Sequence, residues 1–189
     1  MQIFDPTLLF IIACFLIKIG FWISKLSSTK KTVKNKGGEV LRFFFYFFII
    51  FFAYLQYKID FLSINLWPNT LVTKIIADIV TLAGLLVMLW ARKTLDSNWS
   101  ANIVLKEKHE LITSGPYAYV RHPIYTGLSL MVLGVVLYVN TLAFTIFFVL
   151  FFFGAYYKAK KEEKLLISHF SNKYIEYKKK IKALIPYIF

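Results

Sequence analysis

Long apolar runs alternate with shorter polar stretches over most of the 189-residue chain. The apolar runs cover Ile3–Ile23, Phe43–Tyr57, Leu71–Ala91, Ile124–Val139 and Leu142–Tyr157. A helix rises ~1.5 Å per residue, so the first run spans roughly 30 Å, the thickness of a bilayer core, and each of the last two roughly 24 Å. The pattern therefore predicts an all-α, multi-pass integral membrane protein with about five transmembrane helices.

The last two apolar runs are separated only by Asn140 and Thr141. With so short a connector, we expect the two helices to form an antiparallel hairpin. The basic tail that follows, Lys158–Phe189, permits a helix and places apolar residues at helical spacing. We expect it to form an amphipathic helix on the membrane interface, ended by Ile185–Pro186.

The domain organisation follows the same pattern. We expect a single membrane domain over residues 1–189, with three spans in residues 1–91 and the functional part in residues 92–189. The long polar connection in the second part contains Pro116 and Pro123, which prevent one continuous helix through it. Non-helical backbone at membrane depth is stable only where protein buries it or where it lines a cavity.

Composition supports a membrane protein. Hydrophobic residues make up 58% of the chain, which contains 20 Phe, and this is too apolar for an ordinary soluble domain. The net charge is +13 at pH 7, and 20 of the 23 lysines and arginines lie in residues 25–42, 92–121 and 158–189. Basic clusters beside apolar spans indicate the cytoplasmic side and anionic lipid headgroups rather than nucleic acid. The charges predict an outside N-terminus and a cytoplasmic C-terminus.

Two polar or reactive residues inside the apolar runs have simple structural interpretations. Cys14 cannot form an intrachain disulfide because the chain has no second cysteine, and we expect it to be a small buried hydrophobe. Asp78 lies four residues after Lys74 on the same helical face, and a local ion pair between them is the economical prediction.

The candidate chemistry is concentrated in two stretches. The first is HELITSGPYAYVRHPIYTG, from His109 to Gly127, and the second is KAKKEEKLL, from Lys158 to Leu166. A hairpin of two helices of similar length returns Glu162 to the level of His122. We therefore expect a pocket of His, Tyr, backbone groups and a Glu at the cytoplasmic surface, suited to a polar, positively charged ligand. The sequence has no Ser/His/Asp arrangement, no CxxC and no metal-ligand spacing.

These residues carry a resemblance to a known family. GPYAYVRHPIYTG, preceded by HELITS and followed by a short hairpin and KEEKLL, HF, KYIEYKKK and IP, resembles the isoprenylcysteine carboxyl methyltransferase family over roughly Leu95–Pro186. RHPxYxG alone is moderately specific, since membrane phospholipid methyltransferases and sterol reductases carry related runs. Its combination with GPY before it and EE after the hairpin is specific.

The resemblance implies that S-adenosylmethionine binds at the cytoplasmic end, in a helical fold without a Rossmann sheet. The family's cofactor-contacting positions correspond to His109, Glu110, Leu111, Ile112, Tyr117, His122, Pro123, Ile124, Tyr125 and Glu162.

The resemblance also implies a catalytic cation. Where this chain has Lys158 the family often has an Arg, at a position associated with the substrate carboxylate. Lysine keeps that positive charge but lacks the two parallel N–H groups with which an arginine binds a carboxylate. Arg121 or Lys160 could share the role. The predicted catalytic residues are therefore Lys158 and Arg121. We expect Glu163 to be a solvated or helix-surface partner rather than a ligand.

Three functions are consistent with the sequence. The first is methylation of the carboxylate of a prenylated cysteine or a related lipophilic acid, the second is N-methylation of a phospholipid amine, and the third is non-enzymatic binding of anionic lipids. The excess of lysine near the site favours an anionic acceptor. The oligomeric state and the particular membrane are not determined by the sequence.

Overall fold

The structure is a computed structural model that describes residues 5–26, 47, 50–95 and 111–188. Its elements in chain order are α1 (Pro6–Leu26), the 3-10 helix η1 (Asp60–Ser63), α3 (Leu71–Leu95), the 3-10 helix η3 (Gly115–Ala118), α4 (Pro123–Val139), α5 (Leu142–Phe170) and α6 (Asn172–Lys180). Residues 50–58 are also helical. The described residues contain no sheet, only two isolated β-bridges, which confirms the all-α prediction.

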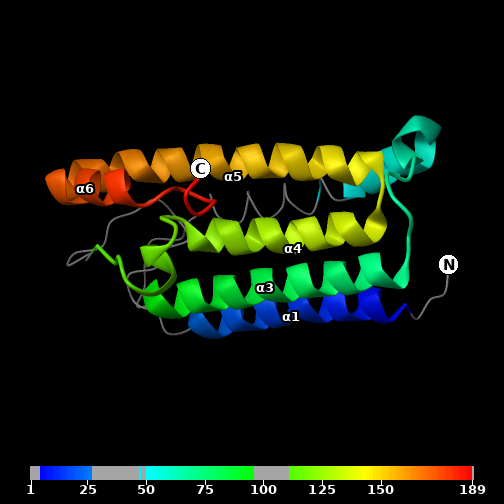
Figure 1. The fold of residues 1–189 in the computed structure, drawn as a ribbon, viewed down its shortest axis with the longest axis horizontal. Helices are drawn as coiled ribbons and strands as arrows, with labels where there is room; N and C mark the ends of the chain where they lie inside the picture. Colours follow the sequence, from blue (N-terminus) through cyan, green and yellow to red (C-terminus); the bar gives the residue numbers. More distant parts are fainter. Residues whose placement is uncertain (1–4, 27–46, 48–49, 96–110, 189) are drawn as a thin grey trace.

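The long helices lie side by side along one axis (Figure 1). Helices α1 and α3 run in the same direction, α4 returns in the opposite direction beside α3, and α5 runs back along α4. Helix α5 projects beyond the start of α4 and carries α6 at its end. We call this end of the bundle, where α3 and α5 end and α4 begins, the polar end.

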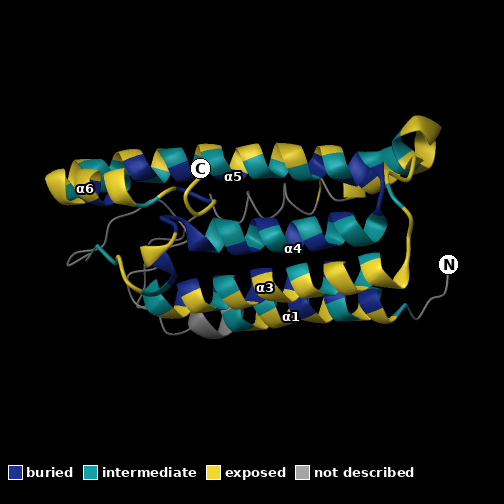
Figure 2. Ribbon diagram, in the orientation of Figure 1, coloured by how far each residue is buried: buried dark blue, intermediate teal, exposed yellow. Residues whose placement is uncertain are grey.

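Two helices of the described part, α3 and α5, are long and apolar enough to cross a membrane. Shorter apolar helices cover Pro6–Phe21 and Pro123–Val139, while much of the predicted second span, Phe43–Tyr57, lies outside the described residues. Exposed positions run along the outer helices of the bundle (Figure 2). Large apolar residues are among the exposed ones, such as Ile79 on α3 and Leu150 on α5. Such faces suit contact with lipid chains, because lipid chains are as apolar as these side chains and exposure to them costs no free energy.

The hairpin between α4 and α5 turns at Asn140, as the sequence predicts. Asn140 ends α4 in the left-handed conformation, with φ of 58°. Its Oδ1 accepts hydrogen bonds from the backbone amides of Leu66 (3.2 Å) and Trp67 (3.0 Å). The turn is therefore fixed from outside as well as by its own backbone, and it holds α4 and α5 antiparallel.

The structure has no helix break between the predicted last span and the tail. Helix α5 does not end at Tyr157 but continues unbroken to Phe170, because residues 158–170 contain no Gly or Pro and are rich in Lys, Glu and Leu, which favour helix. The predicted interfacial helix over the whole tail is reduced to α6, which follows Ser171 at a φ of 48°. The proline is not what ends this helix, since α6 stops at Lys180.

The predicted ion pair between Lys74 and Asp78 is also wrong. Lys74 Nζ lies 2.5 Å from the carboxylate of Asp5, just before α1, and Asp78 instead accepts a hydrogen bond from the Thr7 hydroxyl at 3.3 Å. A partner on the neighbouring helix therefore replaces the local one. Cys14 is buried, as expected, and packs in an apolar cluster with Leu85, Met88 and Met131.

Helices α3 and α4 cross at two glycines whose backbones touch. A Cβ atom built on Gly84 would lie 2.5 Å from the carbonyl oxygen of Gly127, and one built on Gly127 would lie 2.5 Å from the carbonyl oxygen of Gly84. Both distances are too short for any side chain. Small residues of this kind let helix backbones approach closely in a membrane, where packing rather than water exclusion holds helices together.

We predict that Gly127→Leu destabilises the protein, because the new side chain must push α3 away from α4 at backbone rather than at flexible side-chain atoms. Gly154→Leu is the matched control, since a Cβ at Gly154 meets nothing within 4 Å. Thermal unfolding in detergent measures the difference, and the midpoint should fall by several degrees for Gly127→Leu alone. Equal midpoints for the two variants would contradict a tight glycine crossing.

Candidate active site

The polar end begins with the loop before α4. Gly115 has a φ of +61°, and a Cβ there would lie 3.0 Å from the Thr94 hydroxyl, so the loop passes close against the last turn of α3. Pro116 then starts η3, which buries Tyr117. The backbone carbonyl of Tyr117 accepts a 2.6 Å hydrogen bond from the Tyr177 hydroxyl of α6. The GPY turn thus joins the ends of α3 and α6.

The chain after α6 is bound along the entry to α4. The amides of Arg121 and His122 donate to the carbonyls of Lys182 (2.8 Å) and Ala183 (3.0 Å). One turn into α4, the Thr126 hydroxyl donates to the carbonyl of Leu184 at 2.7 Å. This C-terminal strip, residues 181–184, therefore supplies acceptors to the RHP segment and fixes where its side chains emerge.

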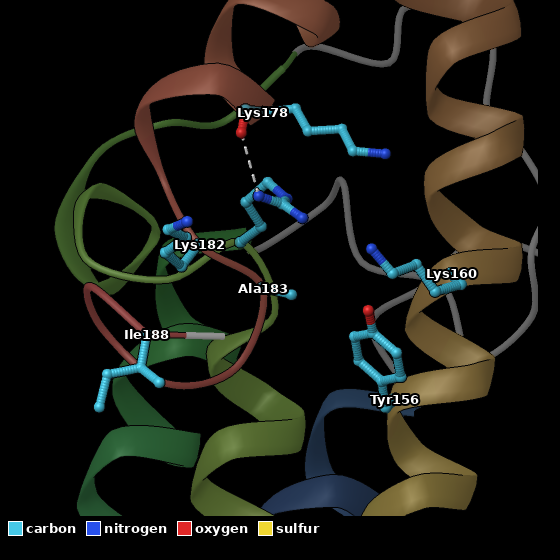
Figure 3. A pocket seen from close by; sticks show the side chains of 7 residues that line it. Tyr156, Lys160, Lys178, Lys182, Ala183 and Ile188 are labelled. Carbon is cyan, nitrogen blue, oxygen red and sulfur yellow. Dashed lines mark hydrogen bonds between the residues drawn. The ribbon is translucent and has the colours of Figure 1, made fainter.

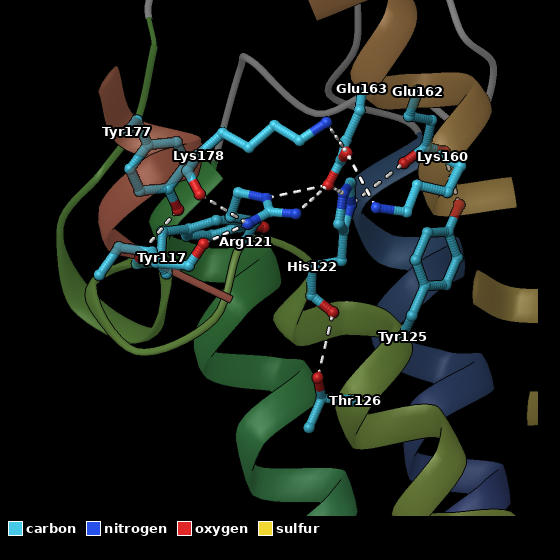
Figure 4. A network of polar contacts seen from close by, with 11 residues as sticks. Tyr117, Arg121, His122, Tyr125, Thr126, Lys160, Glu162, Glu163, Tyr177 and Lys178 are labelled. Atoms are coloured by element: carbon cyan, nitrogen blue, oxygen red, sulfur yellow. Dashed lines mark hydrogen bonds and ion pairs between the residues drawn. The ribbon is translucent and has the colours of Figure 1, made fainter. Parts of the chain in front are cut away.

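Arg121 and Glu163 form a buried ion pair between this segment and α5 (Figure 4). Nε and Nη2 of Arg121 donate to Oε1 of Glu163 at 2.9 and 2.5 Å, and the two side chains are only 5% and 1% exposed. Nη1 of Arg121 donates to the backbone carbonyls of Lys178 and Ile181. The guanidinium thus links the start of α4, the middle of α5 and the end of α6.

The structure corrects the prediction that Glu163 is solvated. Besides Arg121, its carboxylate has Lys178 Nζ at 3.0 Å and Lys160 Nζ at 3.6 Å. A buried carboxylate is stable only when opposite charges and hydrogen bonds replace its water. Glu163 can be buried because it is the shared counter-ion of three cations. Only Lys160 is close to it in the sequence, while Arg121 and Lys178 come from other elements.

Next to this pair, His122, Tyr125 and Glu162 form a second cluster. The Tyr125 hydroxyl donates to Oε1 of Glu162 at 2.5 Å. Nδ1 of His122 lies 3.6 Å from Oε2 of Glu162, and its Nε2 lies 3.5 Å from Oε1 of Glu163. The expectation that the hairpin returns Glu162 to His122 is therefore confirmed.

The His122 imidazole lies between two carboxylates in a buried position. Burial alone lowers the pKa of His122, since it disfavours the charged form. The close carboxylates of Glu162 and Glu163 outweigh burial and raise the pKa of His122 above its ordinary value of 6.5. The structure therefore stabilises the imidazolium form. Burial also raises the pKa of the Tyr117 phenol, which stays neutral.

The structure describes most of the other predicted positions. Pro123 is buried at the first turn of α4, and Ile124 packs against the apolar cluster of Cys14, Leu85, Met88 and Met131. Nζ of Lys158 lies 5.4 Å from the centre of the Tyr125 ring. The half-buried Leu111 and Ile112 precede η3, while His109 and Glu110 lie outside the described residues.

Several residues of the polar end were not expected from the sequence. These are the fully buried Arg92 in the last turn of α3, Tyr174, Tyr177 and Lys178 of α6, and the strip 181–184. The period of the two tyrosines, three residues apart in YIEY, indicates one helical face. Nothing local indicates that this face packs against the GPY turn.

The fold and the polar end define a class of protein. It is a helical membrane protein in which polar residues from the start of α4 and from the last part of α5 gather at one end of the bundle. Residues 74–168, half of the chain, match the isoprenylcysteine carboxyl methyltransferase (ICMT) family. The chain belongs to this family.

Individual relatives agree with this assignment. The chain is 32% identical over 147 residues to the protein-S-isoprenylcysteine O-methyltransferase of Saccharomyces cerevisiae, covering 72% of this chain and 61% of the relative. It is 33% identical over 99 residues to the human protein of the same name, covering 50% of this chain and 34% of the relative. The chain thus spans about three fifths of the yeast relative and about a third of the human one.

A solved structure shares the fold. The eukaryotic intramembrane Ras methyltransferase ICMT superimposes with a TM-score of 0.56 at 22% sequence identity, over 82% of this chain and 55% of that one. The similarity confirms that the arrangement of helices is that of ICMT.

We predict that Glu163→Met lowers the free energy of unfolding by about 3–5 kcal/mol, because Arg121 is then buried without a counter-ion. The double variant Arg121→Met/Glu163→Met should cost clearly less than the sum of the two single variants. Equilibrium unfolding in mixed micelles measures both, with Lys173→Met on the exposed side of α6 as control. Strictly additive effects would contradict the ion pair.

We predict a pH dependence of stability that depends on His122. Because its folded pKa is raised above 6.5, the stability it contributes is fully present below pH 6.5 and is lost as pH rises through the folded pKa. As the pH rises from about 6.5 upward, the thermal midpoint of the wild type should therefore fall more than the midpoint of His122→Gln. His169→Gln, at an exposed histidine of α5, should keep the wild-type slope, and a His122→Gln slope equal to wild type would refute the interpretation.

Proposed function

We propose that this protein transfers a methyl group from S-adenosylmethionine to the carboxylate of a prenylated cysteine or a similar lipophilic acid. The observation that carries the proposal is the meeting of His122 and Tyr125, at the start of α4, with Glu162 of α5. The relatives named above, each a protein-S-isoprenylcysteine O-methyltransferase, support an oxygen rather than an amine acceptor.

The residues of this cluster fit a cationic nucleotide donor. The side chain of Glu162 is 27% exposed and uses one oxygen for Tyr125, so its other oxygen can accept from an ammonium group or ribose hydroxyls. The rings of His122 and Tyr125, with centres 5.9 Å apart, offer faces for stacking. We assign donor binding to this cluster, together with Tyr117, Pro123, Ile124 and the segment His109–Ile112. The donor supplies an electrophilic methyl group carried on a sulfonium.

The chain's own residues have to bind and orient the acceptor. A carboxylate is already ionised at neutral pH, so it needs no general base, and positioning supplies most of the rate. Lys158 stands over the Tyr125 ring and is the cation we assign to the acceptor carboxylate. Arg121 is committed to Glu163 and two carbonyls, so we give it a positioning role: it holds the segment that presents His122.

We further propose that the polar end faces the cytoplasm. This end contains Arg92 in the last turn of α3, Arg121 just before α4, and the basic residues from Lys158 to Lys182 in the last part of α5, in α6 and just after it. Clustered lysine and arginine at the ends of spans mark the cytoplasmic side. With helices running alternately through the bilayer, about five spans place the N-terminus outside and the C-terminus inside. Apolar outer faces of α3 and α5 give a lipophilic acceptor a route from the bilayer.

The test is a methyl-transfer assay on the purified protein with labelled S-adenosylmethionine, offering N-acetyl-S-farnesylcysteine and phosphatidylethanolamine separately. We expect methyl ester formation on the farnesylcysteine and none on the amine. Glu162→Gln should raise the Kd for S-adenosylmethionine at least about tenfold, since a hydrogen-bonded charge contributes about 1.5–3 kcal/mol. Glu176→Gln, at an exposed carboxylate of α6, is the control and should bind normally.

Methylation of the amine alone would overturn the carboxylate acceptor. Absence of saturable S-adenosylmethionine binding, measured by calorimetry, would overturn the enzyme altogether. Equal donor affinity in Glu162→Gln and wild type would place the donor away from the His122–Tyr125–Glu162 cluster.

A further inference from the structure

A cavity of about 290 Å³ lies at the polar end between α5 and the chain after α6 (Figure 3). Four cations line it: Arg121, Lys160, Lys178 and Lys182. Tyr156 of α5, Ala183 and Ile188 line the rest of its wall. The proposed methyl transfer assigns no role to this cavity.

The cavity and the proposed donor site occupy different flanks of α5. Ala155, Ala159 and Glu163 form a buried stripe along this helix. Because residues of a helix are spaced by about 100°, Tyr156 and Lys160 lie on one side of that stripe, whereas Lys158 and Glu162 lie on the other. Lys160 faces Tyr156, with Nζ 4.9 Å from the ring centre, while Glu162 bonds Tyr125. A ligand in the cavity would therefore not occupy the His122–Tyr125–Glu162 cluster.

The charges around the cavity are not balanced. Among the residues that the structure describes, Glu163 is the one carboxylate within 4 Å of these cations, and it is shared by Arg121, Lys178 and Lys160. Lys182 has no such partner in the described part of the chain. Four positive groups against one negative group leave the cavity cationic, and the ligand that this favours is an oxyanion such as a phosphate group.

The position of the cavity along α5 indicates where that oxyanion comes from. Tyr156 and Tyr157 end the apolar part of the helix, and the lysines begin at Lys158. Such an aromatic-to-basic boundary lies at the level of lipid headgroups. Beside the cavity, Tyr187 and Ile188 are 89% and 75% exposed, which suits contact with the bilayer interface rather than with water.

We propose that this cavity binds the phosphate group of an anionic phospholipid, with Lys160 and Lys182 as its accessible cations and the acyl chains directed past Tyr156 into the bilayer. The lipid would hold the strip 181–184 and α5 together from the outside, next to the buried pair of Arg121 and Glu163. This inference concerns a lipid site only and does not rest on the proposed methyl transfer.

The experiment measures binding of fluorescent phosphatidylglycerol to the full chain in neutral detergent, with phosphatidylcholine as the uncharged lipid and inorganic phosphate as competitor. The double variant Lys160→Gln/Lys182→Gln should bind phosphatidylglycerol about 25-fold more weakly, since each lysine near an anionic headgroup contributes a factor of about five. The control Lys164→Gln/Lys179→Gln removes the same charge from exposed positions of α5 and α6 outside the cavity, and its binding should change less than about twofold.

The possible outcomes separate the sources of phosphate. Saturable phosphatidylglycerol binding that phosphatidylcholine and millimolar inorganic phosphate do not displace supports the headgroup site. Displacement by inorganic phosphate at similar affinity overturns the lipid and assigns the cavity to a soluble anion. Equal weakening in both double variants overturns the site in favour of diffuse surface charge. The single variant Lys182→Glu, at an exposed position, must also lose binding, which keeps the test decisive if the double variant unfolds.

Discussion

The buried ion pair between Arg121 and Glu163 is the interaction on which the polar end depends. Neither group could be buried alone, because an unpaired charge away from water costs several kcal/mol. Together with the carbonyls of Lys178 and Ile181, the pair joins the segment before α4 to α5 and to the end of α6. Three pieces of backbone that would otherwise be independent are thereby held in one arrangement, and the neighbouring His122 and Glu162 are presented at a defined separation.

The helical bundle supplies the other constraint. Touching backbones at Gly84 and Gly127 fix α3 against α4, and the turn at Asn140 fixes α5 against α4. Two successive glutamates of α5, Glu162 and Glu163, then differ in how far they are buried. Glu163 continues the buried stripe of Ala155 and Ala159 and becomes structural, while Glu162, rotated by about 100°, stays partly exposed beside Tyr125. The difference in exposure between the two carboxylates follows from their places on the helix and from the elements packed against each.

The two flanks of α5 give the polar end two different chemical surfaces. On one flank a carboxylate, an imidazole and a phenol suit a cationic donor. On the other flank lysines and an arginine surround a cavity that suits an anion. Both surfaces share the buried Glu163, which balances part of the positive charge of the second and contributes to the imidazolium of the first. A change at Glu163 should therefore be felt on both flanks.

The sequence by itself determined the apolar helices, the tight turn at Asn140 and the return of Glu162 to His122, because these follow from local hydrophobic pattern, turn chemistry and the lengths of two adjacent helices. The family was indicated by the resemblance of the motif residues from His109 to Gly127 and from Lys158 to Leu166. The sequence did not determine that α5 continues past Tyr157, that Lys74 pairs with Asp5 rather than Asp78, or that Glu163 is buried. Those outcomes, like the docking of residues 181–184 along the RHP segment, depend on partners far away in the chain. The tertiary structure decided them, because burial of a charge or a backbone group depends on which distant donors and acceptors arrive beside it.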